Sequence, residues 1–175
     1  MKKVAVFGNA GGGKSTLSKR LYQITGLPLH ILDKIQFQSG GAEVPHEDYK
    51  RAHQQILVTD RWIIDGFGCM ETLWQRLNEA DTLVFVDLPL YVHGWWVTKR
   101  FITGYFKPPE GWPQNSPILR SSLTSYRVLW LCHKYLTPKY REYIKQAQNV
   151  KSVYHLRSTK EISQFIELIE TGASA

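Results

Sequence analysis

A glycine-rich stretch near the start of the chain constrains its fold more than any other feature. Residues 8–15 read GNAGGGKS, which matches the phosphate-binding pattern G-x-x-x-x-G-K-[ST] at every fixed position. An apolar run at residues 4–7 precedes the loop, and Leu17, Leu21 and Ile24 follow it at helical spacing. A buried strand, a glycine turn and a helix N-terminus therefore come in the order that lets backbone N–H groups surround an anion. This order predicts a binding site for the phosphates of a nucleoside triphosphate.

The loop itself supplies the chemical groups that bind such a ligand. We expect ATP to contact Gly8, Asn9, Ala10, Gly11, Gly12, Gly13, Lys14, Ser15 and Thr16. The Lys14 ammonium can reach the β- and γ-phosphates, so it is also the first catalytic candidate. The Ser15 hydroxyl is a predicted Mg²⁺ ligand. After the loop, Gly26 and Pro28 are expected to end the helix.

Length and cysteine content bound the organisation of the chain. Its 175 residues suit a single domain spanning positions 1–175. Cys69 and Cys132 are far apart and lack metal-ligand spacing, which indicates a reduced, cytoplasmic protein. The apolar stretch at residues 83–97 is interrupted by an aspartate, a proline and a histidine, so we expect no membrane span.

Short apolar runs alternate with helical patterns along the rest of the chain. Further runs lie at residues 29–32, 62–64, 83–86 and 153–156. Between them we expect helices around Tyr49/Ala52/Ile56, around Leu73/Leu77/Ala80 and over a long region from about 119 to 148, with a last helix capped by Ser158 and Glu161. This alternation predicts an α/β fold, in which helices cover both faces of a parallel sheet.

Polar residues stand where the runs end. Gly8, Asp33, Asp65, Asp87 and Arg157 each follow one of the five runs directly. The carboxyl ends of parallel strands meet at one edge of a sheet, and ligands of open α/β sheets bind there. We therefore expect these five residues to surround one site.

The three aspartates allow different roles. Asp65 is the candidate for the second carboxylate of the metal site, and the alternative is a turn residue that caps the next helix. Asp33 fits a contact to the acceptor or to a Mg²⁺-bound water as well as it fits a helix cap. Asp87 stands in Asp-Leu-Pro, a turn pattern that favours a structural role.

Positive charge and aromatic residues concentrate in the second half of the chain. Residues 88–141 contain eight Lys and Arg and one acid, Glu110. This local excess of seven positive charges equals the net charge of the whole chain, which is +7. Such a local excess predicts an anionic ligand, a triphosphate or a nucleic acid, and a solvated basic face is the plain alternative. The aromatic residues of this region fit packing between helices, or base stacking beside positive charge.

Three segments together resemble a known superfamily. They are the loop, Trp62-Ile63-Ile64-Asp65-Gly66-Phe67-Gly68 and Asp87-Leu88-Pro89. They resemble the P-loop nucleoside monophosphate kinases, and within these the bacterial adenylate kinase-like group labelled DNA topology modulation proteins. The resemblance implies a three-layer P-loop NTPase fold with a five-stranded parallel sheet flanked by helices. It also implies an acceptor-binding insert at about 34–59 and a lid at about 103–119.

One departure from the superfamily concerns the acceptor. Adenylate kinases continue with Pro-Arg where this chain has Gly68 and Cys69, so the arginine that grips the AMP phosphate is absent. Bidentate arginine is the usual solution for a phosphate, and the insert offers Lys50 and Arg51 instead. Two glycines two residues apart allow a close backbone approach, which suits a small hydroxylated acceptor. The predicted acceptor contacts are Asp33, Gly66, Phe67 and Gly68.

These features predict an ATP-dependent kinase that moves the γ-phosphate to a nucleoside, a nucleotide or a hydroxylated metabolite, with Mg²⁺ held by Ser15 and Asp65. Arg100 matches the lid-entry arginine of the superfamily, and it is predicted to be catalytic together with Arg127. Arg120 and Arg157 are predicted to contact the nucleotide. The alternative is a nucleic-acid-associated regulatory ATPase, which the basic region and the label of the subgroup suggest.

Overall fold

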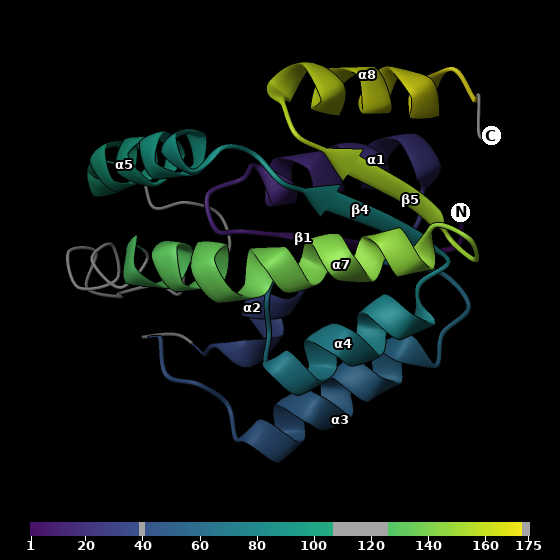
Figure 1. Cartoon of the computed structure of the whole chain (residues 1–175). Helices are drawn as coiled ribbons and strands as arrows, with labels where there is room; N and C mark the ends of the chain where they lie inside the picture. The colour runs from purple at the N-terminus through teal and green to yellow at the C-terminus, as the bar shows by residue number, and fades with distance from the viewer. Residues whose placement is uncertain (39–40, 107–125, 173–175) are drawn as a thin grey trace.

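The structure of the protein is a computed structural model that describes residues 1–38, 41–106 and 126–172 (Figure 1). The side chains of residues 100, 101 and 103–106 lie outside the described part as well.

Five parallel strands form a single sheet. They are β1 (Lys3–Gly8), β2 (Leu29–Ile31), β3 (Trp62–Asp65), β4 (Thr82–Val86) and β5 (Ser152–Leu156), in the spatial order β2-β3-β1-β4-β5. All five predicted runs are strands, although Leu32 begins a helix instead of ending β2. The chain crosses from one side of β1 to the other after β3, so the loop that follows β1 lies at the switch point of the sheet.

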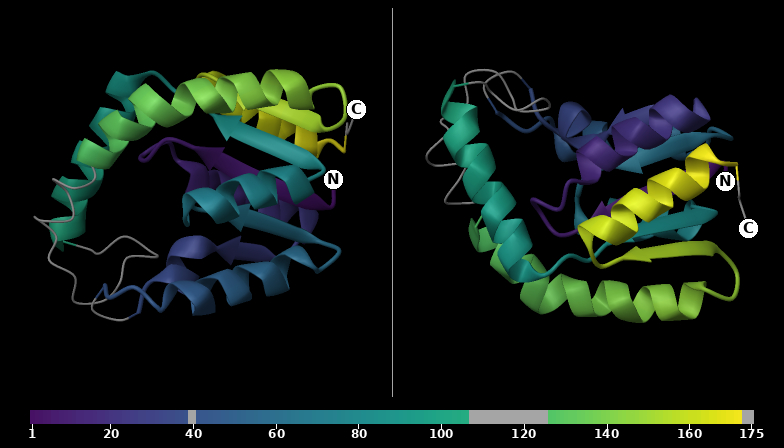
Figure 2. Two further views of the ribbon diagram at one scale, coloured as in Figure 1. Left: turned by 60° about the horizontal axis from the view of Figure 1, so that its bottom comes forward. Right: turned by 90° about the horizontal axis from the view of Figure 1, so that it is seen from above.

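Helices cover both faces of the sheet, as the alternation of runs predicted. Helices α1 (Lys14–Thr25) and α8 (Thr159–Glu170) lie on one face, and α3 (His46–Leu57), α4 (Met70–Glu79) and α7 (Thr137–Ala147) lie on the other (Figures 1 and 2). Alternate residues of β1 serve the two cores. Val4 and Val6 pack toward the first face, and Ala5 and Phe7 pack toward the second. The three-layer α/β fold is thereby confirmed.

The segment between β2 and β3 contains the expected insert. Its elements are α2 (Leu32–Gln36), an antiparallel bridge between Phe37 and Glu43, and α3. Asp33 therefore stands in the first turn of a short helix.

The region expected to be a lid begins inside a helix. Helix α5 runs over Leu90–Phe106, so residues 103–106 are helical, although we expected the glycines and prolines from 103 onward to prevent a continuous helix. Gly94 and Gly104 are both accommodated inside α5. The rest of the expected lid, residues 107–119, lies outside the described residues. Figure 2 shows α5 beyond the carboxyl ends of the strands.

The long helical region is confirmed from residue 126 onward, and residues 119–125 lie outside the described part. A helical stretch at residues 126–131 continues through a π-helical segment, Cys132–Leu136, into α7. The hydroxyl groups of Tyr126 and Thr98 share a hydrogen bond, which joins this stretch to α5.

The predicted helix ends agree with the structure. Gly26 ends α1 in the left-handed conformation. The Ser158 hydroxyl accepts from the Glu161 N–H at 3.1 Å, while the Glu161 carboxylate accepts from the Arg157 N–H, one residue before the cap. Within the described part of the chain, none of the helices combines the length and the apolar character needed to cross a membrane.

A lysine closes the C-terminal end of α4. The Lys151 ammonium donates to the carbonyl oxygens of Leu77 at 2.9 Å and Ala80 at 2.8 Å, and also to that of Asn78. These carbonyls belong to the last turn of α4 and its exit, where a helix has no backbone donors of its own. Lys151 thus ties α4 to the start of β5, at the amino edge of the sheet.

We expect Lys151→Met to lower the free energy of unfolding by about 1–3 kcal/mol, because three carbonyl groups lose a charged donor while the aliphatic part of the side chain is kept. Urea denaturation followed by circular dichroism measures this change. An unchanged midpoint would show that water replaces the ammonium at no cost.

Candidate functional site

The glycine-rich loop lies between β1 and α1, at the carboxyl edge of the sheet. A Cβ on Gly8 would lie 2.1 Å from the Val86 carbonyl oxygen, so no side chain fits between β1 and β4 at this point. Gly13 adopts the left-handed conformation as N-cap of α1. The backbone N–H groups of the first turn of α1 then face the loop, and Ser15 and Thr16 are exposed beside them. A strand, a glycine turn and a helix N-terminus are thus arranged as an anion-binding site requires, and binding of phosphate by this loop stays a prediction.

Helix α5 packs directly on the loop. A Cβ on Gly11 would lie 2.9 Å from the His93 carbonyl oxygen, and a Cβ on Gly12 would lie 2.9 Å from His93 Cε1. A Cβ on Gly13 would lie 2.5 Å from Trp96 Cζ3. Gly11 and Gly12 stand at positions that the phosphate-binding pattern leaves free. The contact with α5 is therefore a second reason for glycine here, besides phosphate binding.

Hydrogen bonds fix the loop from both sides. The Asn9 amide donates to the Leu129 carbonyl at 3.0 Å and accepts from the Ala10 N–H at 2.8 Å. His93 Nδ1 lies 2.7 Å from the Ala10 carbonyl oxygen, so this nitrogen carries the proton. Burial lowers the pKa of His93, which keeps its ring neutral. His93 thus has a structural role, because its hydrogen bond positions the loop.

The Lys14 ammonium lies inside the loop and donates to the Asn9 carbonyl at 2.6 Å. A backbone carbonyl is a neutral acceptor, so a phosphate oxygen placed nearby would be a stronger partner for the same ammonium. Lys14 is therefore held close to the position where its predicted role requires it.

Asp65 ends β3 directly beside β1, where it is paired with Val6. Its side chain is buried, with 1% of the residue exposed, and neither carboxylate oxygen accepts a hydrogen bond from the described part of the chain. Helix α4 begins later, at Met70, with Cys69 as its N-cap, so the alternative role of Asp65 as a helix cap is wrong. A buried carboxylate without donors is unstable unless a cation or water meets it.

Ser15 and Asp65 fit a Mg²⁺ ion that is held mainly by phosphate oxygens and water. Among the described residues, no group of three or more His, Cys, Asp or Glu side chains could hold a metal ion. Mg²⁺ retains several waters and needs one or two protein ligands when phosphates are present, so such a group is not required.

Arg76 holds the segment that follows Asp65. Its guanidinium is fully buried and donates to the carbonyl oxygens of Phe67 at 3.0 Å and of Gly66. Burial lowers the pKa of Arg76, and nearby tyrosines and Asp65 oppose that shift. Arg76 was not among the functional residues predicted from the sequence. The signal was an arginine on the apolar stripe of α4, between the buried Leu73 and Leu77.

The segment turns through two glycines with positive φ, +115° at Gly66 and +67° at Gly68. A Cβ on Gly68 would lie 2.0 Å from the Tyr49 hydroxyl oxygen of α3. A Cβ on Gly66 would lie 3.4 Å from Asp33 Oδ1. The structure therefore brings Asp33 next to the glycine segment, as predicted, and leaves Phe67 exposed between the two glycines.

The structure describes the side chains of two of the four predicted arginines. Arg157 follows β5 and is exposed, and Arg127 is exposed two residues before Leu129, which binds the loop. Arg100 belongs to α5, but its side chain lies outside the described part, as does the whole of Arg120.

The two cations of the insert that could replace the missing phosphate grip are paired. Lys50 lies 3.1 Å from the Glu71 carboxylate and 3.8 Å from that of Glu47. Arg51 lies 3.6 Å from the Asp48 carboxylate on its own helix.

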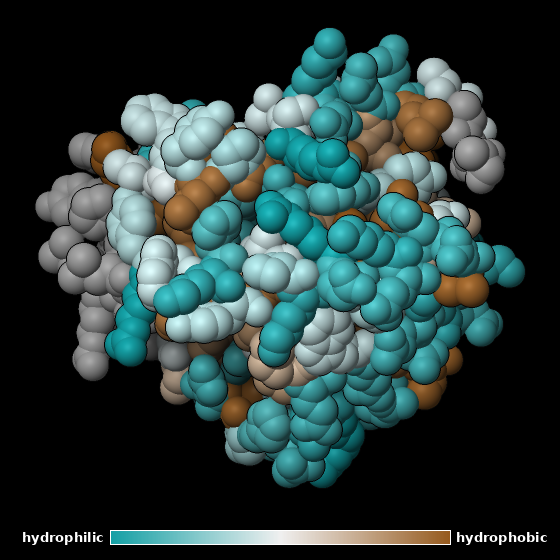
Figure 3. Space-filling model, viewed as in Figure 1, coloured by the Kyte–Doolittle hydropathy of each residue, from teal (hydrophilic) through white to brown (hydrophobic). Residues whose placement is uncertain are grey.

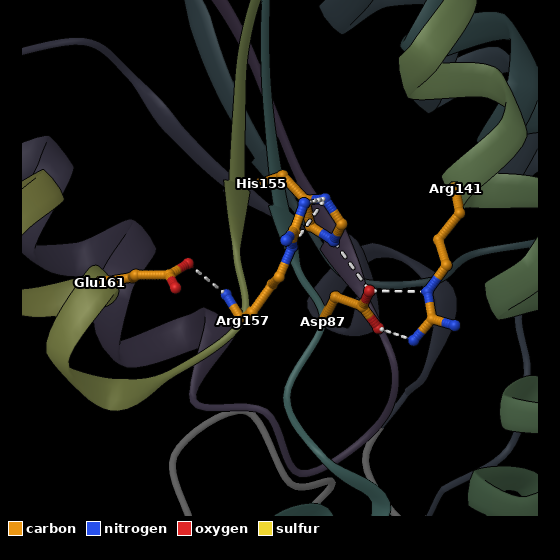
Figure 4. A network of polar contacts seen from close by, with 5 residues as sticks. All are labelled: Asp87, Arg141, His155, Arg157 and Glu161. Carbon is orange, nitrogen blue, oxygen red and sulfur yellow. Dashed lines mark hydrogen bonds and ion pairs between the residues drawn. The ribbon is translucent and has the colours of Figure 1, made fainter.

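Asp87 is the centre of a polar network at the end of β4 (Figure 4). Its carboxylate accepts from Arg141 Nε at 2.8 Å and Nη2 at 3.0 Å, and from His155 Nε2 at 2.8 Å. Arg157 Nε donates to His155 Nδ1 at 3.3 Å. Since an arginine can only donate, Nδ1 is bare and the proton of the neutral ring sits on Nε2. Burial opposes the ionisation of Asp87, but His155 and Arg141 outweigh it and hold its pKa at about 2.

The described tryptophans of the basic region lie in two kinds of environment. Trp96 packs on Gly13, whereas Trp95 and Trp130 are exposed, and the Lys134 ammonium lies 4.9 Å from the centre of the Trp130 ring. Figure 3 shows pale and brown side chains gathered on the surface over α5. The packing interpretation therefore holds for Trp96, and base stacking on the exposed rings stays a prediction.

The chain is similar to solved structures, and the first of the two matches below shows the fold. A shikimate kinase from Acinetobacter baumannii in complex with shikimate matches with a TM-score of 0.60 and 14% identity, over 100% of this chain and 96% of that chain. An unliganded sugar kinase from Janibacter sp. HTCC2649 matches with a TM-score of 0.47 and 18% identity, over 99% and 92%. No protein-family model matches the chain, and neither does any curated protein. The chain therefore has a P-loop kinase fold, and the resemblance to the adenylate kinase-like subgroup stays a prediction.

Asp87 predicts a defined acid sensitivity. Its folded-state pKa of about 2 lies below the ordinary value of 3.8, so its contribution to stability is complete above about pH 4 and is lost as the pH falls toward 2. We expect Asp87→Asn to destabilise the protein at neutral pH and to flatten the loss of stability between pH 4 and pH 2. Urea denaturation at several pH values measures both effects.

Asp60→Asn is the matched control, because Asp60 is exposed in the turn before β3. If the control flattens the acid limb as much as Asp87→Asn does, the Asp87 network is not its source.

Proposed function

We propose that this chain is an ATP-dependent kinase that transfers the γ-phosphate to a hydroxyl group of a small acceptor. The observation that carries the proposal is the buried Asp65 carboxylate, without donors among the described residues and one strand away from the phosphate-binding loop. A loop that only bound an anion would have no use for a second negative charge at this position. A loop that binds a nucleotide together with its metal ion needs such a negative charge, because the carboxylate interacts with the cation.

The chain's own residues divide the work of the transfer. The loop N–H groups bind the β- and γ-phosphates, and Lys14 neutralises charge on the phosphate that moves. Ser15 and Asp65 would hold a Mg²⁺ ion and its waters, and the ion would supply charge neutralisation for the phosphates. Asp33, exposed beside Gly66, accepts the proton of the acceptor hydroxyl while that oxygen bonds to the γ-phosphorus and the bond to ADP breaks.

The charges on the insert favour an acceptor without a phosphate of its own. Lys50 and Arg51 are each paired with carboxylates, and Nη1 and Nη2 of Arg76 donate to backbone carbonyls. Gripping a phosphate with Lys50, Arg51 or Arg76 would require breaking one of these contacts. The exposed ring of Phe67 and the Asp33 carboxylate suit a hydroxylated acceptor with an apolar face, such as a nucleoside. Roles for Arg100, Arg120, Arg127 and Arg157 at the nucleotide belong to the same proposal.

We expect Lys14→Ala to reduce phosphoryl transfer by about a hundredfold or more, because it removes the charge that follows the moving phosphate. Calorimetry with Mg²⁺ and a non-hydrolysable ATP analogue measures binding, and ADP release with a panel of acceptors measures transfer. Lys145→Ala, at an exposed position of α7, is the control. Absence of nucleotide binding by the wild type would reject the proposed function.

We expect AMP to be a poor acceptor compared with nucleosides and other hydroxylated compounds, because Lys50 and Arg51 of the insert are already paired with carboxylates. A comparison of kcat/KM across these acceptors tests this. An AMP value of about 10⁵ M⁻¹s⁻¹ or more, in the range of ordinary enzymes, would contradict it.

A further inference from the structure

We propose that Arg76 is a positioning residue, which presents Asp65 to the metal by holding the backbone that follows it. The inference rests on the proposed function and assigns a role to a buried side chain that is not among the proposed catalytic or binding groups.

The first observation is the place of Arg76. It stands on the buried face of α4 with no exposed surface, and a buried guanidinium is costly unless its donors are used. Leucine at this position would continue the apolar stripe of Leu73 and Leu77 at no such cost. A stabilising role in the core is therefore a weak reason for the arginine.

The second observation is where its donors go. Nη1 and Nη2 bind the carbonyl oxygens of Phe67 and Gly66, the two residues that come directly after Asp65. Arg76 and Asp65 influence each other electrostatically, yet no hydrogen bond joins them. Arg76 thus supplies positive charge near Asp65 without occupying either carboxylate oxygen.

The third observation is that the same segment is held from its other side. Gly68 contacts the Tyr49 hydroxyl so closely that a methyl group would not fit, and Tyr49 shares a hydrogen bond of 3.1 Å with Thr72 of α4. The segment from Asp65 to Gly68 lies between a guanidinium and a phenol, both of them buried. Its position is set before any ligand arrives, which is what an outer-shell metal carboxylate needs.

The test measures how much Mg²⁺ strengthens the binding of a non-hydrolysable ATP analogue, as the ratio of its affinities with and without Mg²⁺. In Arg76→Lys the charge is kept but one ammonium cannot reach both carbonyls in the same planar geometry. We expect the ratio to fall about tenfold, the usual scale for a residue that supports a metal ligand. Binding without Mg²⁺ should be unchanged.

A double-mutant cycle separates positioning from general damage. Asp65→Asn should lower the ratio on its own, and adding Arg76→Lys should lower it no further, because Arg76 acts through Asp65. Lys151→Met is the matched control. It also removes a cation that binds backbone carbonyls of α4, but at the far end of that helix, so it should cost stability and leave the ratio intact.

Additive effects in the cycle, or an unchanged ratio in Arg76→Lys, would overturn the inference while leaving the proposed function standing. If Arg76→Lys does not fold, Gly68→Ala displaces the same segment from the Tyr49 side and should lower the ratio, with partial recovery in Gly68→Ala/Tyr49→Phe. A ratio unaffected by Gly68→Ala overturns it equally. A wild type that binds no nucleotide overturns both proposals.

Discussion

The site depends on the close backbone contact between Gly8 and β4. Because a Cβ at this position would lie 2.1 Å from the Val86 carbonyl oxygen, any other residue would force β1 and β4 apart where the chain leaves the sheet. The loop would then lose its contacts with α5 on one side and with Leu129 on the other, since both reach it from elements that follow β4. The anion cradle thus follows from the strand order and from one residue without a side chain.

Two aspartates beside β1 show how one sheet edge separates structure from chemistry. Asp65 ends β3 on one side of β1, and Asp87 follows β4 on the other. Asp87 accepts from two basic residues, so its charge is neutralised within the protein and fixes α7 and β5 to the edge. Asp65 receives no such donor from the described residues. An aspartate is therefore a structural link after β4, where it is Asp87, and a candidate metal-site residue at the end of β3, where it is Asp65.

What could be predicted from the sequence was local. The loop, the five strands and the helices flanking them each leave a pattern within some fifteen residues, and the order of these patterns implies the parallel sheet. The support of the loop is not local in sequence. Asn9 and its partner Leu129 are 120 residues apart, and Ala10 and its partner His93 are 83 residues apart. The course of α5 through Gly104 was missed because helix propensity alone is a weak guide to where a helix ends. Arg76 does have a local sequence signature, because it is an arginine on the apolar stripe of α4. From the sequence alone, such an arginine is interpreted as a long side chain that reaches the surface, and its burial becomes known only from the structure.

The contacts that cations make within the protein also change how the net charge of +7 should be interpreted. Arg141 neutralises Asp87, Lys151 and Arg76 bind backbone carbonyls, and Lys50 and Arg51 meet carboxylates on or beside α3. These cations are committed to the fold, so the positive field that a ligand meets is smaller than the composition suggests. Lys14 differs from them in its place, because the carbonyl to which it donates belongs to the phosphate-binding loop itself. When a phosphate enters the loop, the Lys14 ammonium can replace its hydrogen bond to the neutral Asn9 carbonyl by one to a charged phosphate oxygen, and the packing of the fold need not change. Under the proposed function, Lys14 is therefore the cation that can turn to a nucleotide with the smallest loss of contacts within the protein.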